Sequence, residues 1–434
     1  MEVTNGEKKL SRFLIFQIII IGIIFSAAQI FGYLEAEIFN TFLDHVLRLA
    51  YLYISIMVAL SAIVGLISNL ILGILSDNSR SRFGRRRPFL LFGGLLAGLS
   101  MIIYPFSQDY LTAVIIDVIA VGIASNSYYV AQRALIPDLV DIEYRGRANG
   151  ITNVLGNLGL LIGIASTLII NDMFGLPDLF GLTGTIITRE GYIVILFIGG
   201  FVLLLVSIVG FLFIKEKPTS ELPPKKPFFE EFREIFEIEE FRKNREFFKF
   251  VFAFTIFNSG IYTILPYLFI YIFDLGFSGL TMVIILGTAA PIVFILMYLL
   301  GKVADKHGRK RSITPIIIIS CIGFVLIPFL NTSNELFFIL YIFAFTSVLT
   351  VLLGILTPLN AWYQDLLPEE KRGKFLGILN ITNTVSQVIG ALVGGIIATI
   401  FGLSFIFAFA PIFFIIALPL FMRIKETLPG IEIK

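Results

Sequence analysis

The sequence predicts an all-α, polytopic membrane protein with twelve transmembrane helices in two repeated six-helix bundles. Three observations support this fold class. The 434 residues are 57% hydrophobic and 15% charged and include 45 Phe, which is too apolar for a water-soluble globule. Twelve apolar runs are long enough to cross a bilayer, and charged loops of similar sequence recur in the two halves of the chain.

The apolar runs divide into two sets of six. The first set comprises residues 13–34, 49–75, 89–106, 110–135, 148–170 and 192–214. The second comprises residues 247–273, 281–300, 313–330, 336–362, 375–400 and 403–421. A helix crosses the hydrocarbon core in roughly 17 to 25 residues, and in lipid it satisfies its backbone hydrogen bonds within its own segment. The first run is too long for the apolar region of a signal peptide, so we predict that it is an uncleaved first span.

Basic residues are distributed unequally among the loops. An even number of spans places both termini on one side of the membrane. If that side is the cytoplasm, all of the 33 Lys and Arg residues lie inside except Arg48 and Arg189. Because Lys and Arg are retained on the cytoplasmic face, we predict a multi-pass protein of the cell membrane with both termini in the cytoplasm.

The spans define three regions. We expect an N-terminal six-helix bundle over residues 1–214, a cytoplasmic linker over 215–246, and a C-terminal six-helix bundle with a short cytoplasmic tail over 247–434. The linker begins with a proline-rich stretch, and its second part carries Phe and Ile among Glu and Arg at helical spacing. This pattern predicts an amphipathic helix on the inner leaflet; binding of a partner protein is the alternative.

The charged loop GILSDNSRSRFGRRRP, residues 73–88, has a shorter counterpart in GKVADKHGRKR, residues 301–311. A second pair, ALIPDLVDIEYRGRANGITN at 134–153 and AWYQDLLPEEKRGKFLGILN at 361–380, is separated by nearly the same distance along the chain. A loop that only oriented the protein would have no reason to recur. Two six-helix halves in parallel repeat are typical of a transporter that rocks around a central site.

These helices and the G-x-x-x-D…G-R-[KR] loops resemble the major facilitator superfamily over nearly the whole chain. The stretches SDNSRSRFGRRRP and QRALIPDL are similar, more particularly, to the sucrose transporters and the glycoside-pentoside-hexuronide cation symporters. The resemblance implies a secondary active transporter that moves a sugar by proton symport and alternating access, with helices 1, 4, 7 and 10 lining the cavity. A uniporter, a symporter of another solute, and a sugar sensor that does not transport remain alternatives.

Polar and aromatic residues recur on single faces of helices 1, 4, 7 and 10 at about 100° per residue. The candidate solute contacts are Gln29, Tyr33, Glu37, Asn126, Tyr129, Asn258, Tyr262 and Thr350. Glu35 falls on nearly the opposite face of helix 1, and Asp117 points away from the polar face of helix 4. The alternative is that these polar groups bond between packed helices.

Glu37 is the first candidate for proton coupling and Asp117 is the second, because a carboxyl buried in a membrane is usually functional. In the sucrose transporters an Asp stands at the position of Gly122, and a Gln or Glu at that of Ala36, so the resemblance does not carry a proton-binding role to these two positions. The alternative for Glu35 and Glu37 is that helix 1 ends near Tyr33 and that both lie in a wet loop.

The repeated loops supply candidates for gating, namely Gly73, Asp77, Arg85, Arg145, Gly301, Asp305, Arg309 and Arg372. The resemblance implies that Asp77 meets the start of helix 11, at 372–374, while the cytoplasmic side is closed. By the repeat, Asp305 should meet the start of helix 5, at 145–147. A carboxylate at a helix N-terminus gains about 0.3 to 1 kcal/mol from the helix dipole when exposed.

Other functional classes receive no support. The chain has no P-loop sequence for ATP, and its two His residues and single Cys are far apart in the sequence. We therefore expect no enzyme activity, no metal and no cofactor. The net charge of +2 gives no support for nucleic-acid binding. The expected partners are a small-molecule sugar, a coupling cation such as H+ and the lipid bilayer, and the expected state is a monomer.

Overall fold

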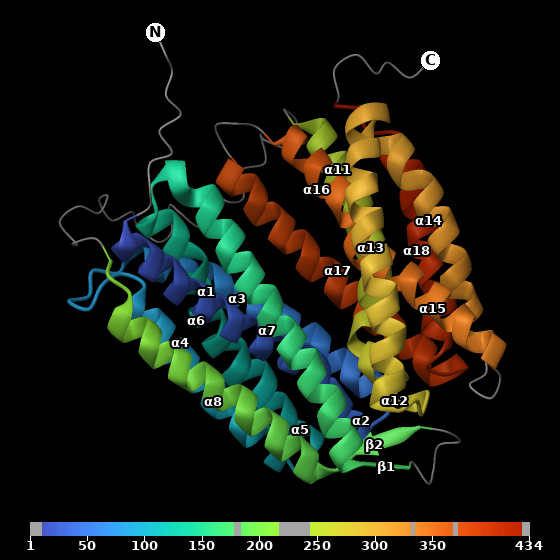
Figure 1. Cartoon of the computed structure of the whole chain (residues 1–434), viewed down its shortest axis with the longest axis horizontal. Helices are drawn as coiled ribbons and strands as arrows, with labels where there is room; N and C mark the ends of the chain where they lie inside the picture. Colours follow the sequence, from blue (N-terminus) through green and yellow to red (C-terminus); the bar gives the residue numbers. More distant parts are fainter. Residues whose placement is uncertain (1–10, 178–183, 217–243, 331–334, 368–371, 428–434) are drawn as a thin grey trace. The chain divides into compact units, whose positions relative to one another are not determined.

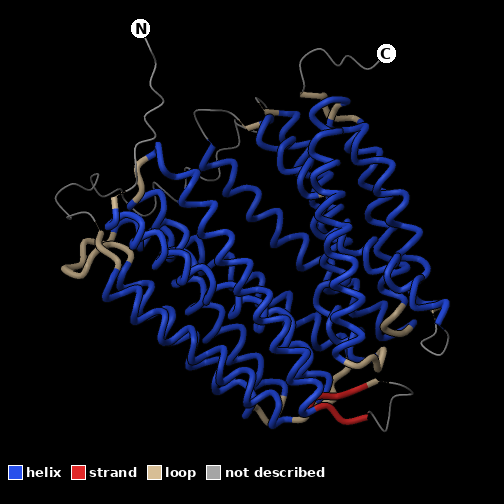
Figure 2. Tube along the Cα trace, viewed as in Figure 1, coloured by secondary structure: helices blue, strands red, loops and turns tan. Residues whose placement is uncertain are grey.

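The computed structural model describes residues 11–177, 184–216, 244–330, 335–367 and 372–427. Within these ranges twelve helices are long enough and apolar enough to cross a membrane, and nearly all of the remaining chain forms short connections (Figure 2). The prediction of an all-α polytopic fold with twelve spans is therefore confirmed. The predicted amphipathic helix of the linker lies outside the described residues.

The helices of the first half are drawn in Figure 1. They are α1 (Arg12–Tyr33), α2 (Phe39–His45), α3 (Tyr51–Asn78), α4 (Arg87–Ile103), α5 (Tyr110–Val114), α6 (Gly122–Leu139), α7 (Arg145–Phe174) and α8 (Arg189–Phe213). The first span joins α1 to α2, and the fourth joins α5 to α6, without leaving the helix. Between α7 and α8 the strands β1 (Gly175–Pro177) and β2 (Thr185–Ile187) pair antiparallel.

The second half repeats this order of helices. Its helices are α11 (Arg245–Ile264), α12 (Leu268–Asp274), α13 (Gly279–His307), α14 (Arg309–Leu326), α15 (Glu335–Leu349), α16 (Leu356–Leu366), α17 (Arg372–Phe401) and α18 (Phe405–Met422). The seventh span joins α11 to α12, and the tenth joins α15 to α16.

The chain forms two compact units, which are described separately. The first unit is drawn from residues 1–38, 67–168 and 192–228, and the second from residues 39–66, 169–191 and 229–434. The units group residues by contact, so they differ from the division at 214 and 246 that the repeat predicts. That division stays a prediction.

Helix α1 lies at the centre of the first unit, where small residues bring its neighbours close. A Cβ added to Gly159 of α7 would stand 2.4 Å from the carbonyl oxygen of Ser26, and one added to Gly210 of α8 would stand 2.5 Å from a Leu90 methyl and 3.0 Å from Ile24 of α1. On the α6 side, the Tyr128 hydroxyl donates to the Ile24 carbonyl at 3.1 Å. Lipid supplies no hydrophobic force between helices, so close backbone packing holds them together.

The second unit packs α11 in the same manner against α17 and α18. A Cβ on Gly390 of α17 would stand 2.4 Å from the Ser259 carbonyl oxygen, and one on Gly260 of α11 would stand 2.6 Å from the ring of Phe414 in α18. Ends of first-half spans also belong to this unit. The Ile187 N–H donates to His45 Nδ1 at 3.1 Å, so the hairpin between α7 and α8 is fastened to α2.

Gly159→Ala should lower the melting temperature, because the new methyl group would meet the backbone of α1 and would force two helices apart. Gly150 lies in the same helix with nothing within 4 Å of an added Cβ, so Gly150→Ala is the matched control. In the control, Ala replaces Gly in a helix, a change that favours the helix by up to about 1 kcal/mol. Thermal unfolding of the purified variants in detergent measures both effects, and equal melting temperatures would contradict the packing argument.

Candidate functional site

Helices 1, 4 and 10 each contain a π-helical turn, at Leu34–Ile38, Ile115–Val121 and Thr350–Gly354. A π turn widens the helix locally and is frequent at functional sites. Helix 1 continues through its π turn as far as His45, so Glu35 and Glu37 lie within the span. The alternative in which helix 1 ends near Tyr33 is therefore wrong.

The π turns also change which way the acidic residues face. The Glu35 carboxylate is close enough to that of Asp117 for the two to interact electrostatically, and it interacts with Tyr129 of α6 as well. A Cβ on Gly32 would stand 3.0 Å from the Tyr129 hydroxyl, which shows how closely α1 and α6 approach. The expectation that Glu35 and Asp117 point away from the polar faces is wrong, because it assumed a uniform 100° per residue.

Glu37 is buried, with 9% of its surface exposed. Its Oε2 atom has no hydrogen-bond partner among the residues that the structure describes. Tyr33, one turn earlier, interacts electrostatically with Glu37 and packs against α7, where a Cβ on Gly163 would stand 2.8 Å from its ring. Tyr33 and Glu37 therefore share a buried face of the first span.

A cluster of polar side chains, here termed the amide cluster, lies between α3 and α6 in the first unit. It comprises Asn69, Asn126, Tyr129 and Arg133. The Asn69 Nδ2 donates to Asn126 Oδ1 at 3.3 Å, and Asn126 Nδ2 donates to the Gly122 carbonyl at 2.7 Å. The Arg133 guanidinium lies 5.9 Å from the centroid of the Tyr129 ring. Sequence analysis missed Asn69, although an amide within an apolar span was a usable signal.

The predicted solute contacts of the second unit are largely engaged with neighbouring helices. The Asn258 Nδ2 donates to Asn383 Oδ1 of α17 at 3.0 Å, and Asn258 is buried. The Thr350 hydroxyl donates to the Thr346 carbonyl at 2.7 Å. Tyr262 is half-buried, with its Cβ beside Gly390. By contrast, Gln29 in the first unit is exposed. Roles for these residues in solute binding stay predictions.

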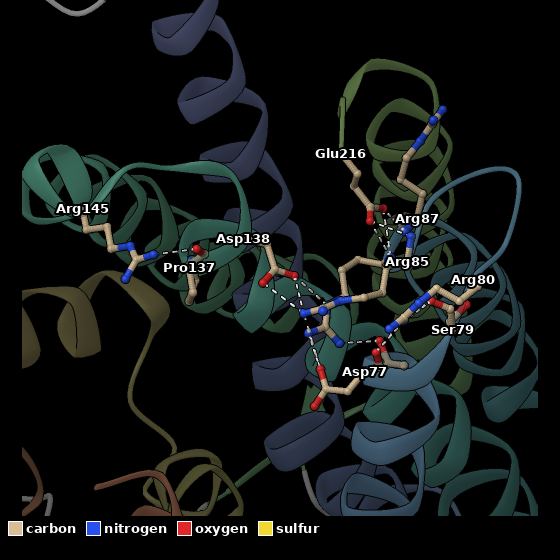
Figure 3. Close-up of polar contacts among 11 residues, drawn as sticks. Asp77, Ser79, Arg80, Arg85, Arg87, Pro137, Asp138, Arg145 and Glu216 are labelled. Carbon is tan, nitrogen blue, oxygen red and sulfur yellow. Dashed lines mark hydrogen bonds and ion pairs between the residues drawn. The ribbon is translucent and has the colours of Figure 1, made fainter. Parts of the chain in front are cut away.

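A network of charges lies at the end of α3 and is termed the first-unit charge network (Figure 3). It comprises Ser76, Asp77, Arg85, Arg86 and Asp138. Arg86 Nε donates to Asp138 Oδ2 at 2.9 Å, Arg85 Nη2 donates to the same oxygen at 3.0 Å, and Arg86 also pairs with Asp77. The Arg86 guanidinium donates to the Ser76 hydroxyl at 2.7 Å, and its side chain is only 5% exposed. Asp77 and Arg85 were predicted gating residues, whereas Arg86 and Asp138 were missed.

Glu216, which follows α8, caps the start of α4 (Figure 3). Its carboxylate accepts the backbone N–H groups of Arg85, Arg86 and Arg87 at 2.6, 2.9 and 2.7 Å. These donors have no partner within the helix, and a negative charge at this end gains from the helix dipole. Sequence analysis missed this role, because Glu216 and Arg85 are far apart in the sequence.

Two further predicted gating residues lie beside this network. Arg145 donates through Nη2 to the Pro137 carbonyl at 2.7 Å and through Nε to the Val140 carbonyl at 3.0 Å (Figure 3). It therefore binds the last carbonyls of α6. Gly73 lies in α3 with nothing within 4 Å of an added Cβ.

The second unit has a similar network. Arg309 Nη2 lies 3.5 Å from Asp365 Oδ2, and the Lys310 N–H donates to Glu426 Oε2 at 3.3 Å. Asp365 stands 227 residues after Asp138 in the sequence, and Glu426 binds the start of α14 as Glu216 binds that of α4. Gly301 lies within α13. The side chains of Asp305 and Arg372 lie outside the described part of the chain, so their predicted contacts stay predictions.

Comparison with known proteins agrees with this duplicated architecture. The family model for the Major Facilitator Superfamily matches residues 13–361 and 351–432. The chain belongs to the major facilitator superfamily. Family and fold together indicate a multi-pass membrane transporter of small molecules and not an enzyme.

Several curated relatives match parts of the chain. An uncharacterised MFS-type transporter of Methanocaldococcus jannaschii is 25% identical over 82% of this chain and 84% of its own length. The multidrug resistance protein MdtG of Proteus mirabilis is 30% identical over 39% of this chain and 41% of the relative. A sucrose transport protein of Arabidopsis thaliana is 30% identical over 24% of this chain and 21% of the relative. A general alpha-glucoside permease of Schizosaccharomyces pombe is 33% identical over 22% and 21%. The chain thus spans less than half of the last three.

Solved structures share the fold at low sequence identity. A bacterial homologue of the human lysosomal transporter Spinster, inward-facing and occupied, has a TM-score of 0.71 at 13% identity and covers 95% of this chain and 97% of its own. The nucleoside transporter NupG has a TM-score of 0.71 at 11% identity and covers 94% and 98%. At these identities the likeness shows the fold alone.

Proposed function

We propose that this major facilitator moves a sugar, either a mono- or disaccharide or a glycoside, by proton symport with alternating access. The observation that carries the proposal is the amide cluster of the first unit, where Asn69, Asn126 and Tyr129 lie together with Arg133. Amides both donate and accept hydrogen bonds, as sugar hydroxyls do, and an aromatic ring can pack against the C–H face of a sugar. The sucrose and alpha-glucoside relatives support the same substrate class.

A second candidate function is export of drug-like molecules, which the match to the multidrug resistance protein MdtG favours. Such solutes are mostly apolar and would gain little from paired amides. Uniport, symport of a non-sugar solute and sugar sensing without transport differ from the proposal in the measurement that distinguishes them. Binding without counterflow identifies a sensor, and insensitivity to a proton ionophore identifies a uniporter.

Three buried or half-buried carboxyls support coupling to protons. We propose Glu37 as the first proton carrier, since it is buried and its Oε2 has no partner among the described residues. Asp117 and Glu35, which interact with each other, form the second candidate. The distribution of Lys and Arg supports residence in the cell membrane as a monomer with both termini in the cytoplasm.

The proposal is tested with purified protein reconstituted into liposomes. We expect at least one sugar in a panel of mono- and disaccharides to raise the melting temperature, as binding to the folded state requires, and to undergo counterflow. A proton ionophore should then abolish its accumulation. If the preparation moves a drug-like cation or another solute but no sugar, the sugar assignment is wrong.

We propose that the first-unit charge network and the matching residues of the second unit close the cytoplasmic side. Asp77→Asn should weaken the pairing with Arg85 and Arg86 and favour the state that is open to the cytoplasm. Cysteines introduced along helix 1 should then react faster with a reagent added from the cytoplasmic side. Unchanged labelling in Asp77→Asn would count against a gating role.

A further inference from the structure

The two units repeat the packing of their first and fifth spans closely. In the first unit Gly163 of α7 lies against Tyr33 of α1, and in the second Gly390 of α17 lies against Tyr262 of α11. Equivalent residues are 229 apart on the first and seventh spans and 227 apart on the fifth and eleventh. Gln29 therefore corresponds to Asn258, and Gly156 corresponds to Asn383.

The repeat is broken at this second pair. In the second unit the Asn258 amide donates to Asn383 Oδ1 at 3.0 Å and is buried. In the first unit Gly156 has no side chain to offer, and the nearest atom of Gln29 to an added Cβ would be Cγ, at 3.5 Å. Gln29 is exposed, and its amide makes no hydrogen bond within the described ranges.

The exposed side of α1 does not face lipid along most of its length. Helices α6, α7 and α8 each contact α1, through Tyr128, Gly159 and Gly210. An amide left unsatisfied in lipid costs several kcal/mol, and polar groups within a span usually face a water-filled cavity. Gln29 is therefore available to a solute in water.

We infer that the Gln29 amide is the specificity-determining hydrogen-bonding contact for the solute, and that it is free for this role because Gly156 stands where the second unit has Asn383. The amide would bind the hydroxyl groups of a carbohydrate, since it offers both donors and an acceptor. Asn258, held by Asn383, is a structural residue. This inference rests on the proposed sugar transport and names the contact that selects the sugar.

The test supplies Gln29 with the partner that it lacks. In Gly156→Asn the new amide can bond to Gln29 as Asn383 bonds to Asn258, and the KM for sugar counterflow should rise about tenfold, which is the loss of one hydrogen bond. Gly156→Ala adds only the Cβ, at an ordinary contact distance, and should produce a much smaller rise. Asn383→Ala should lower the melting temperature and leave the KM unchanged.

A double-mutant cycle separates this role from a general effect on packing. In a Gln29→Ala background, Gly156→Asn should cause no further rise in KM, because the contact is already absent. If Gly156→Asn does not fold, Gln29→Ala alone should raise the KM about tenfold. The inference is overturned if the Asn and Ala variants of Gly156 have equal KM values, or if Gln29→Ala leaves the KM unchanged.

The sugar proposal and this inference can fail separately. If the protein transports a different solute, the same variants are measured with that solute. A tenfold rise would then retain Gln29 as the selecting contact while the sugar assignment fails, and no rise would overturn the inference itself.

Discussion

Glu37→Gln should abolish accumulation of sugar driven by a proton gradient while sparing counterflow. The side chain is buried, and its Oε2 has no partner among the described residues, so a charge there would be costly. The amide has the shape of the protonated acid but cannot release a proton. Counterflow needs no net movement of protons, whereas accumulation against a gradient does. Uptake into proteoliposomes under an imposed pH gradient, compared with counterflow in the same preparation, measures both.

Glu143→Gln is the matched control, because Glu143 is an exposed carboxylate in the connection between α6 and α7. It should accumulate sugar as the wild type does. If Glu37→Gln also concentrates sugar normally, coupling lies elsewhere. Asp117→Asn and Glu35→Gln are then the variants to measure, since these two carboxylates interact with each other.

Asp138→Ala should lower the free energy of unfolding by about 3 kcal/mol, since truncating one partner of a buried ion pair leaves the other charge uncompensated. Asp138 accepts from both Arg85 and Arg86, and the Arg86 side chain is only 5% exposed (Figure 3). Asp77 would still pair with Arg86, so the loss falls at the lower end of the range for buried pairs. Thermal and denaturant unfolding in detergent measure the change.

Asp141→Ala provides the comparison for that variant. Asp141 is exposed, lies three residues away, and makes no side-chain cap of the short helix that follows it. Its replacement should change stability by less than about 0.5 kcal/mol. Equal stability of the Asp138 and Asp141 variants would show that the first-unit charge network does not stabilise the first unit.

The twelve spans and their duplication were determined by the sequence alone. Span length and apolar composition are properties of single segments, because each helix satisfies its own backbone in lipid. The charged loops at 73–88 and 301–311 are likewise local, and their recurrence indicated two parallel halves before any contact was known. The family assignment agrees with both.

Which side chains meet was decided only by the tertiary structure. The faces of Glu35 and Asp117 depend on π turns, whose extra residue has no signal in a periodicity that assumes 100° per residue. Asn69 and Glu216 act through partners that are distant in sequence. Gln29 and Asn258 look alike as polar residues on an inner helix, yet one is exposed and the other is bonded to Asn383. That difference depends on what the neighbouring helix presents, which no single segment contains.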